Sequence, residues 1–166
     1  MRSILAILAA AALAACDPMP APAPAAAGAD SISLERTLCY GSCPAYRLSI
    51  ARDGTVRFQS RNPGEPATAA HRIAPAAFGA LAGEAERIGF RSLPDEIAAD
   101  RPLCGLRMTD SPSAIVTIHG SAGTKSVNDY HGCEGKSERL AELRRFEERI
   151  DSVAGSARWV RPPTRR

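Results

Sequence analysis

Residues 45–61, which read AYRLSIARDGTVRFQSR, have the pattern of a β-hairpin. Apolar side chains alternate with polar or small ones on both sides of Asp53-Gly54, at Tyr46, Leu48, Ile50, Val56 and Phe58. A period of two places one side-chain face of each strand in a core. Asp-Gly is a favoured pair for a two-residue type I′ turn, in which both positions need a positive φ. We therefore expect two antiparallel strands joined tightly at Asp53-Gly54.

The residues on either side of the hairpin continue the sheet and add two helices. Alternating stretches predict further strands at residues 31–38, 68–73, 113–119 and 124–130. Apolar residues at helical spacing predict one helix from Pro75 to Gly89 and a second over residues 137–153. Gly79 and Gly83 favour a close approach of the first helix to the sheet. The expected fold is α+β, an antiparallel sheet of about five or six strands with two helices packed on one face.

The first residues have the composition of a secretion signal. Arg2 supplies a positive charge, and residues 3–12 form an apolar run that is too short to span a bilayer. The run ends in Leu13-Ala14-Ala15-Cys16, which resembles the cleavage box of bacterial lipoproteins. That resemblance implies cleavage before Cys16 and its acylation by fatty acids such as palmitate, and several acyl chains on one residue anchor a protein stably. The alternative is an ordinary secretion signal with a chance cysteine.

The residues after Cys16 have the composition of a tether. Residues 17–30 are rich in proline and alanine, and such a composition favours extended polyproline structure. At about 3.1 Å per residue, the tether would hold the domain roughly 40 Å from the membrane. A Pro-rich ligand for a partner is the alternative interpretation. The expected organisation is a signal peptide at 1–15, an anchor and tether at 16–30, one globular domain at 31–160 and a basic tail at 161–166.

Four cysteines remain after Cys16, namely Cys39, Cys43, Cys104 and Cys133. An even number of cysteines in an exported domain indicates two disulfides. Three connectivities are possible, and spacing alone does not choose between them. We favour Cys39–Cys43, which Gly41-Ser42 allows to close tightly, together with Cys104–Cys133. The second bridge would close a loop of about 30 residues, which corresponds to roughly 3–4 kcal/mol in the chain-entropy account.

The segment around the first two cysteines contains Leu34-Glu35-Arg36, Cys39-Tyr40-Gly41-Ser42-Cys43-Pro44-Ala45-Tyr46 and Asp53-Gly54-Thr55-Val56. These residues resemble a family of uncharacterised bacterial domains, domain of unknown function 6438. Further similarity lies at Gly89-Phe90, Thr109-Asp110, residues 125–130, Ile150-Asp151 and Trp159, so the resemblance spans about residues 31–160. It implies a fold and no activity. Many members lack counterparts of Cys104 and Cys133, which supports the favoured pairing because these two are then an added pair.

The Cys39-x-x-x-Cys43-Pro44 segment also resembles the copper-carrying motif of cytochrome-oxidase assembly proteins. Those proteins bind the metal with two thiolates and a distant histidine, and thiolates select Cu(I). They hold the motif on a strand-to-helix turn, whereas Pro44 leads directly into a strand. A thiol-redox or copper-handling protein that uses Cys39 and Cys43, with His119 or His131, is therefore the alternative function. We otherwise expect His131 to be a solvated turn residue.

Charge and motifs exclude several classes of function. The formal net charge of +3 is dispersed, and it lacks the dense basic stripe of a nucleic-acid-binding protein. No serine lies in a nucleophile elbow, and the acidic residues at 95–100 lack the alternation of a calcium loop. We expect no catalytic residue, no metal site and no cofactor. The favoured interpretation is a non-enzymatic binding or structural module, anchored in an envelope membrane and facing the periplasm, with an envelope protein as partner. Asp17 resembles an inner-membrane retention signal and favours that membrane.

Overall fold

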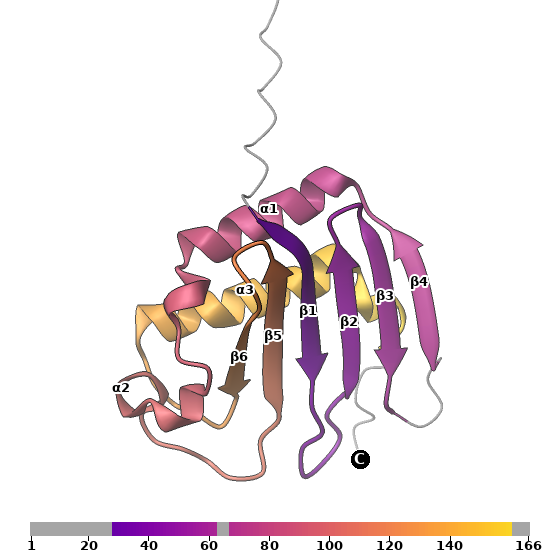
Figure 1. Cartoon of the computed structure of the whole chain (residues 1–166). Helices are drawn as coiled ribbons and strands as arrows, with labels where there is room; N and C mark the ends of the chain where they lie inside the picture. Colours follow the sequence, from indigo (N-terminus) through magenta and orange to yellow (C-terminus); the bar gives the residue numbers. More distant parts are fainter. Residues whose placement is uncertain (1–27, 63–66, 161–166) are drawn as a thin grey trace, which may run out of the picture.

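A computed structural model describes residues 28–62 and 67–160 of the chain. Within them, six antiparallel strands form one sheet in the order β4-β3-β2-β1-β5-β6, so the first strand lies near the centre (Figure 1). The strands are β1 (Ala29–Arg36), β2 (Tyr46–Ala51), β3 (Thr55–Ser60), β4 (Thr68–Arg72), β5 (Ser113–Gly120) and β6 (Lys125–Tyr130). β1 pairs with β2 on one side and with β5 on the other, which joins the two ends of the domain.

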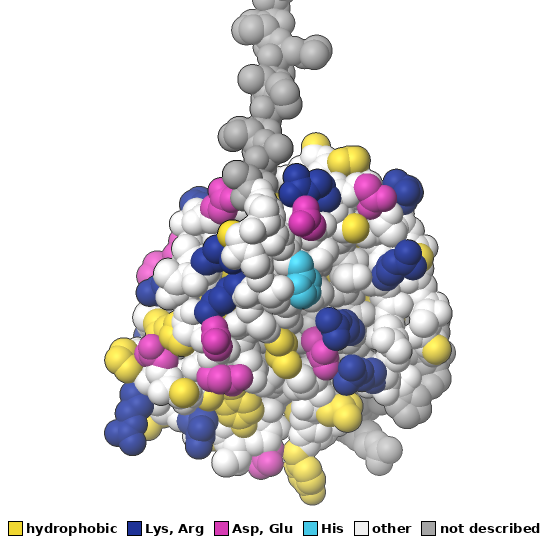
Figure 2. All heavy atoms as spheres, viewed as in Figure 1, with side chains coloured by type: hydrophobic (Ala, Val, Ile, Leu, Met, Phe, Trp, Pro, Cys, Tyr) yellow, Lys and Arg dark blue, Asp and Glu magenta, His cyan; other side chains and the backbone are white. Residues whose placement is uncertain are grey.

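Two long helices, α1 (Pro75–Arg87) and α3 (Glu138–Ala154), cover one face of the sheet (Figure 1). The short α2 (Arg101–Cys104) and the 3₁₀ turns η1 (Phe90–Ser92) and η2 (Ile97–Ala99) lie in the connection between α1 and β5. A third 3₁₀ turn, η3 (Ser156–Arg158), follows α3. The α+β fold expected from the sequence is confirmed. No described helix packs on the other face of the sheet, which we call the open face, and its side chains are mostly charged or polar (Figure 2).

The core lies between the helices and the covered face of the sheet. Alternate strand residues point into it, and each is at most 5% exposed: Ile32, Leu34, Leu48, Ile50, Val56, Phe58, Ala114, Val116, Ile118 and Val127. The apolar stripe of α3 meets them with Leu140, Leu143, Phe146 and Ile150. Trp159 closes one end of the core, because its ring stacks on Phe58 with centroids 5.0 Å apart. Burial of these side chains is the main favourable term in folding.

The hairpin forms where it was expected, but its turn is of another type. Gly54 N donates to Ala51 O at 2.9 Å, so Arg52 and Asp53 occupy the middle of the turn. Gly54 has a φ of 82°, and no non-glycine residue of this hairpin has a positive φ. The type I′ prediction is therefore wrong, since the loop has the type I turn followed by a left-handed glycine of a three-residue connection. The carboxylate of Asp53 favours this form because it accepts from Thr55 N at 2.9 Å.

The glycines of α1 do not have the role that was expected of them. No atom lies within 4 Å of a Cβ built at Gly79 or at Gly83, so neither residue permits a close approach to the sheet. That prediction is wrong. The helix instead packs through its larger side chains, Phe78 and Leu81, and Gly89, two residues after its end, has a φ of 65°.

Several sequence-based predictions fall outside the described residues. These are the signal peptide at 1–15, the lipidation site at Cys16, most of the tether and the basic tail at 161–166. Among the residues that the structure does describe, no helix is both long and apolar enough to cross a membrane.

Candidate functional site

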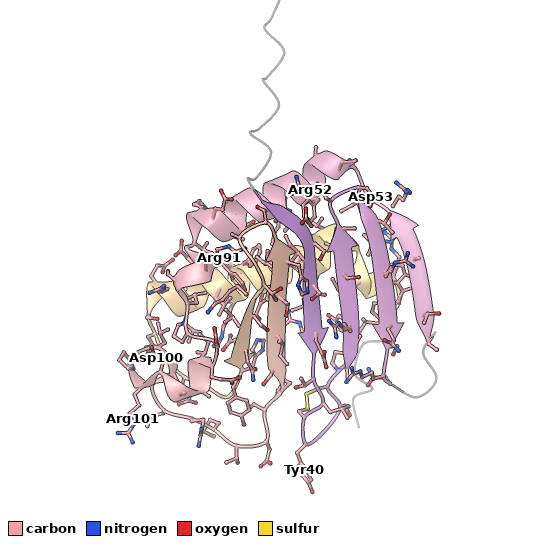
Figure 3. The ribbon with its side chains drawn as sticks, in the orientation of Figure 1. Tyr40, Arg52, Asp53, Arg91, Asp100 and Arg101 are labelled. Carbon is pink, nitrogen blue, oxygen red and sulfur yellow. A yellow bond between two sulfur atoms is a disulfide. The ribbon has the colours of Figure 1, made fainter. Side chains whose placement is uncertain are left out.

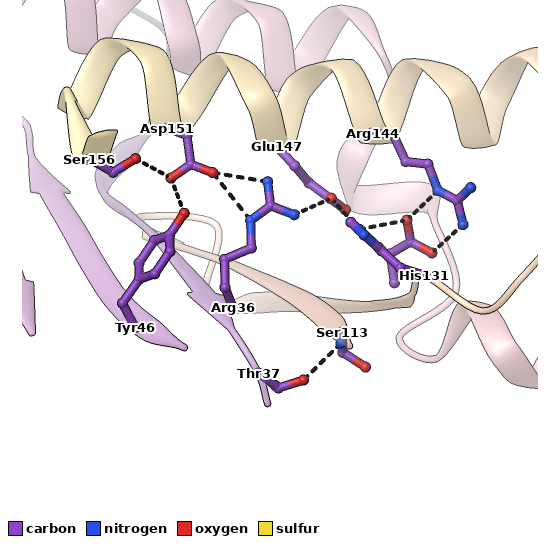
Figure 4. Close-up of polar contacts among 10 residues, drawn as sticks. Arg36, Thr37, Tyr46, Ser113, His131, Arg144, Glu147, Asp151 and Ser156 are labelled. Carbon is purple, nitrogen blue, oxygen red and sulfur yellow. Dashed lines mark hydrogen bonds and ion pairs between the residues drawn. The ribbon is translucent and has the colours of Figure 1, made fainter. Parts of the chain in front are cut away.

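A row of charged side chains lies between α3 and the end of the sheet where β1 and β6 finish (Figure 4). Glu147 and Asp129 are the two acidic residues of this row that solvent does not reach, with exposures of 1% and 0%. Because a buried charge is costly unless it is paired and hydrogen-bonded, the partners of these carboxylates define the chemistry of the site. The row falls into two halves, one around Asp151 and one around Glu147.

The half around Asp151 ties the first two strands to the end of α3. Tyr46 Oη donates to Asp151 Oδ1 at 2.7 Å, and Ser156 Oγ donates to the same oxygen at 2.8 Å. Arg36 donates to Asp151 Oδ2 through Nε at 3.2 Å and Nη2 at 3.0 Å. Both oxygens of Asp151 are therefore satisfied, and this half of the row is a closed structural network.

The half around Glu147 contains the only histidine of the row. His131 Nε2 lies 2.9 Å from Glu147 Oε2 and 3.7 Å from Asp129 Oδ2. Arg36 Nη1 donates to Glu147 Oε2 at 3.3 Å, and Arg144 Nε donates to Asp129 Oδ2 at 2.9 Å. Glu147 Oε1 is buried and has no hydrogen-bond partner. One oxygen of this carboxylate thus has two partners while the other has none.

Burial and neighbouring charges shift the pKa values of three groups in the row. Burial raises the pKa of Glu147, with the nearby Asp129 charge adding to it, although the hydrogen bond from His131 opposes the shift. Burial also raises the pKa of Tyr46, and the negative charge of Asp151 raises it further. For Arg36, burial lowers the pKa, but the charges of Asp151 and Glu147 outweigh it and the net shift is upward. A raised carboxyl pKa together with a raised arginine pKa marks this row as an unusual electrostatic environment.

The sequence produces the row through ordinary strand and helix periodicity. Asp129 is two residues after Val127 in β6, so it points into the covered face where an apolar residue normally lies. Arg144, Glu147 and Asp151 are separated by three and four residues on α3, which places them on one face of that helix. Arg36 is the last residue of β1 and reaches both Glu147 and Asp151.

A second feature lies at the same end of the sheet, in two loops that we call the tip: residues 37–45 and residues 105–112. Large exposed hydrophobic side chains gather there, as Figure 2 shows along the lower end of the molecule: Leu38, Tyr40, Leu106 and Met108. Tyr40 is 91% exposed and points away from the domain (Figure 3). Its backbone N donates to Asp110 O at 3.2 Å, which links the two loops.

Both disulfides stiffen the tip. Cys39 and Cys43 are bonded within the first loop, with Cα atoms 5.7 Å apart. Cys104 is bonded to Cys133 at the base of the second loop, with Cα atoms 4.6 Å apart. This is the pairing that was favoured from the sequence. Backbone hydrogen bonds from Met108 N to Gly132 O and from Glu134 N to Leu106 O, both 2.8 Å, fix the second loop further.

The comparison with known families agrees with this architecture. Residues 30–154 match the family model described as Domain of unknown function (DUF6438). The chain belongs to the DUF6438 family. The match begins in β1 and ends with the last residue of α3, so it contains the whole sheet and both long helices. No curated protein matches the chain.

The DUF6438 domain does not bring its histidines to the first cysteine pair. His119 pairs with Ser31 near the start of β1, about eight residues before Cys39, so it lies at the other end of the sheet. Among the described residues, the only group of three potential metal ligands within 4.8 Å contains Asp129, His131 and Glu147, and no cysteine. His131 lies in a turn, as expected, but its side chain is only 29% exposed and is bound to Glu147, so it is not freely solvated.

Sequence reasoning missed most of the charged row of the DUF6438 domain. Arg144 turns inward, where it donates to Asp129 and to Cys133 O. A signal was available for two residues. Asp129 follows the inward positions of β6, and Glu147 lies beside Phe146 within the apolar stripe of α3.

Proposed function

We propose that this chain is a bacterial lipoprotein on the periplasmic side of the cell envelope, and that its DUF6438 domain is a non-enzymatic binding module. The tip would hold a protein partner. The observation that carries the proposal is the set of four large hydrophobic side chains exposed on two disulfide-stiffened loops. Large exposed hydrophobic side chains that gather in one region of a surface are typical of interaction sites.

The position of the tip relative to the anchor supports a protein partner. β1 starts beside the hairpin turn, where Arg52 N donates to Asp30 O, and the tip follows the other end of β1. Figure 3 places Tyr40 at the opposite end of the domain from Arg52 and Asp53. A chain anchored through Cys16 would therefore direct its tip away from its own membrane, toward proteins of the envelope.

The stiffness of the tip supports binding as its role. Ordering a flexible loop on association costs about 0.5–1.5 kcal/mol for each immobilised side chain. Two disulfides and the hydrogen bond between Tyr40 and Asp110 hold the loops in place before a partner arrives. Because the loop backbone is already ordered, binding has less entropy to remove, and tyrosine and methionine are enriched in protein interfaces.

The anchor is tested by metabolic labelling with a fatty acid. The full chain should incorporate label and fractionate with membranes, and Cys16→Ser should lose both. Incorporation into the Cys16→Ser variant, or an unlabelled wild type in the soluble fraction, would contradict the anchoring part. Thiol titration of the exported protein should find no free thiol. Two reactive thiols together with bound copper would favour the copper-handling alternative at Cys39 and Cys43.

The binding role is tested by photo-crosslinking in intact cells. A photoreactive amino acid replaces Tyr40 or Leu106 at the tip, or Arg57 on the open face of the sheet as a matched control. Tip positions should give one discrete adduct, and the control should give none. The adduct should be lost when the remaining tip residues are changed by Leu38→Ser and Met108→Ser. Equal adducts from the control position, or none from either tip position, would overturn the proposed binding surface.

A further inference from the structure

The cluster of Asp129, His131 and Glu147 offers three potential metal-binding atoms within 4.8 Å of one another. Two of the residues come from the end of β6 and the turn after it, and the third comes from the middle of α3. Acidic clusters are common on protein surfaces, but here both carboxylates are buried, with exposures of 0% and 1%. A buried acidic pair needs a positive partner.

The hydrogen bonding of Glu147 is an independent observation that points to a ligand. Its Oε2 atom accepts from His131 and from Arg36, whereas its Oε1 atom is buried without a partner. Buried carboxylate oxygens nearly always have a partner, and an exception indicates a missing water or ion. The unpaired atom belongs to the carboxylate that lies 2.9 Å from His131 Nε2, so it is part of the same cluster.

The charges around the cluster do not balance. Three carboxylates, those of Asp129, Glu147 and Asp151, face two guanidinium groups, those of Arg36 and Arg144. With a neutral imidazole at His131, the row therefore has one excess negative charge. Arg36 donates to Oε2 of Glu147 and Arg144 donates to both oxygens of Asp129, so the two arginines hold the carboxylates as outer hydrogen-bond partners do around metal ligands. A cation among the three ligand atoms would supply the missing positive charge.

The separations between the ligand atoms suit a small tetrahedral cation. Bonds of about 2.0–2.1 Å to zinc place neighbouring ligand atoms about 3.3 Å apart in a tetrahedral site. His131 Nε2 lies 2.9 Å from Glu147 Oε2 and 3.7 Å from Asp129 Oδ2, so each of these two separations is within about half an ångström of the tetrahedral value. The His131 side chain is 29% exposed, so solvent reaches one side of the cluster.

We propose that Asp129, His131 and Glu147 form a binding site for a divalent cation of the zinc class. One imidazole nitrogen and two carboxylate oxygens are ligands that Zn²⁺ accepts. The cation joins the end of β6 to α3, and Arg144 and Arg36 orient the two carboxylates. The site contains no residue of the tip, so this proposal does not depend on the proposed protein partner. Its effect is to stabilise the contact between α3 and the sheet.

The experiment measures metal binding by the full chain, purified from membranes without a histidine tag and treated with a chelator. Co²⁺ is titrated first, because its visible absorption reports tetrahedral coordination, and Zn²⁺ then displaces it. One Co²⁺ per chain with a tetrahedral spectrum is expected. His131→Asn should weaken binding by at least about tenfold. His119→Asn is the matched control, since His119 lies on the open face and bonds only to Thr124 in the described structure.

Thermal unfolding provides a second readout. Zn²⁺ at about one hundred times its dissociation constant should raise the Tm of the wild type and of His119→Asn by about 5–10 °C, because it binds only the folded state. The same Zn²⁺ concentration should raise the Tm of His131→Asn by about half as much or less, and a folded circular dichroism spectrum of that variant in the absence of metal shows that the loss is specific. The proposal is overturned if the wild type binds no Co²⁺ at micromolar concentrations. An equal loss of Co²⁺ affinity in His131→Asn and His119→Asn, or an unchanged affinity in His131→Asn, would also overturn the proposal.

Discussion

The hydroxyl of Tyr46 lies 2.7 Å from Oδ1 of Asp151, and this hydrogen bond joins the first residue of β2 to the last turn of α3. Tyr46 is 4% exposed, so water cannot replace Asp151 as its partner. The same carboxylate binds Arg36 and Ser156. Four donor groups therefore converge on Asp151, namely the two hydroxyls and two nitrogens of Arg36. These hydrogen bonds fix how α3 lies across the sheet.

Tyr46→Phe should lower the free energy of unfolding by about 1–2 kcal/mol, because it removes one hydrogen bond to a charged acceptor and keeps the buried ring. Asp151 Oδ1 retains Ser156 as a donor, which limits the loss. Urea unfolding measures the change. Tyr40→Phe is the control, since that hydroxyl is exposed and the change should be within about 0.5 kcal/mol. Equal stabilities of the two variants would contradict the role of the Tyr46 hydroxyl.

The two disulfides should differ in their contribution to stability. Removing Cys104–Cys133 by double substitution with alanine opens a loop with a sequence separation of 29, and the expected loss is about 3–4 kcal/mol. Removing Cys39–Cys43 opens a loop with a sequence separation of 4, and the free energy of unfolding should fall by about 2 kcal/mol. Guanidinium unfolding of each double variant measures its loss of stability and shows which disulfide contributes more. A larger loss from the short loop would show that the chain-entropy account does not apply here.

The turn of the hairpin should respond to acid through Asp53. Hydrogen bonds from Thr55 N and Thr55 Oγ1 hold the pKa of Asp53 below its usual value, and Arg72 adds to the shift. A depressed pKa in the folded state contributes stability that is present above the unfolded pKa of about 3.9 and is lost as the pH falls through the folded value. The stability of the wild type should therefore fall more steeply below about pH 4 than that of Asp53→Asn.

The measurement is the urea midpoint of both proteins at neutral and acidic pH. Thr55→Val serves as an intermediate control, because it removes the hydroxyl bond to Asp53 and keeps the backbone bond. Parallel pH profiles for the wild type and Asp53→Asn would show that the carboxylate does not contribute in this way.

The sheet and the two helices followed from local patterns of the sequence. The disulfide pairing did not, because spacing left three connectivities open and the family resemblance supported the favoured one. Strand alternation located β2 and β3 to within one residue. The apolar stripe located α3, which begins one residue after its N-cap, Ser137. Such patterns act over a few residues, so one sequence suffices to detect them. The turn at Asp53 was assigned to the wrong type because a side-chain hydrogen bond to Thr55 N selected the conformation.

The charged row could not be predicted in the same way. Arg36 and Asp151 are separated by 115 residues, and their contact depends on how α3 crosses the sheet. Nothing local distinguishes Arg144, which turns inward to Asp129, from the solvent-exposed arginines of the same helix. Polar residues at inward positions, such as Asp129 in β6, are the one signal that sequence periodicity offers for a site of this kind.

Gly135 should tolerate no side chain, unlike Gly83 in α1. A Cβ at Gly135 would collide with the carbonyl oxygen of Leu103, beside the Cys104–Cys133 bridge, whereas no atom lies within 4 Å of a Cβ at Gly83. Gly135→Ala should therefore lower the free energy of unfolding by about 2–3 kcal/mol through steric overlap. Gly83→Ala should raise it by about 0.5–1 kcal/mol, because alanine loses less backbone entropy in a helix.

Thermal and urea unfolding of the two single variants test this contrast in sign. Because both substitutions add the same methyl group, a difference between them reports the local backbone and not the chemistry of the change. A stabilised Gly135→Ala variant would mean that the chain from Cys133 to α3 can move away from Leu103. In that case the bridge between Cys104 and Cys133 would not hold the base of the tip rigid, and the low entropic cost of binding argued for the tip would be lost.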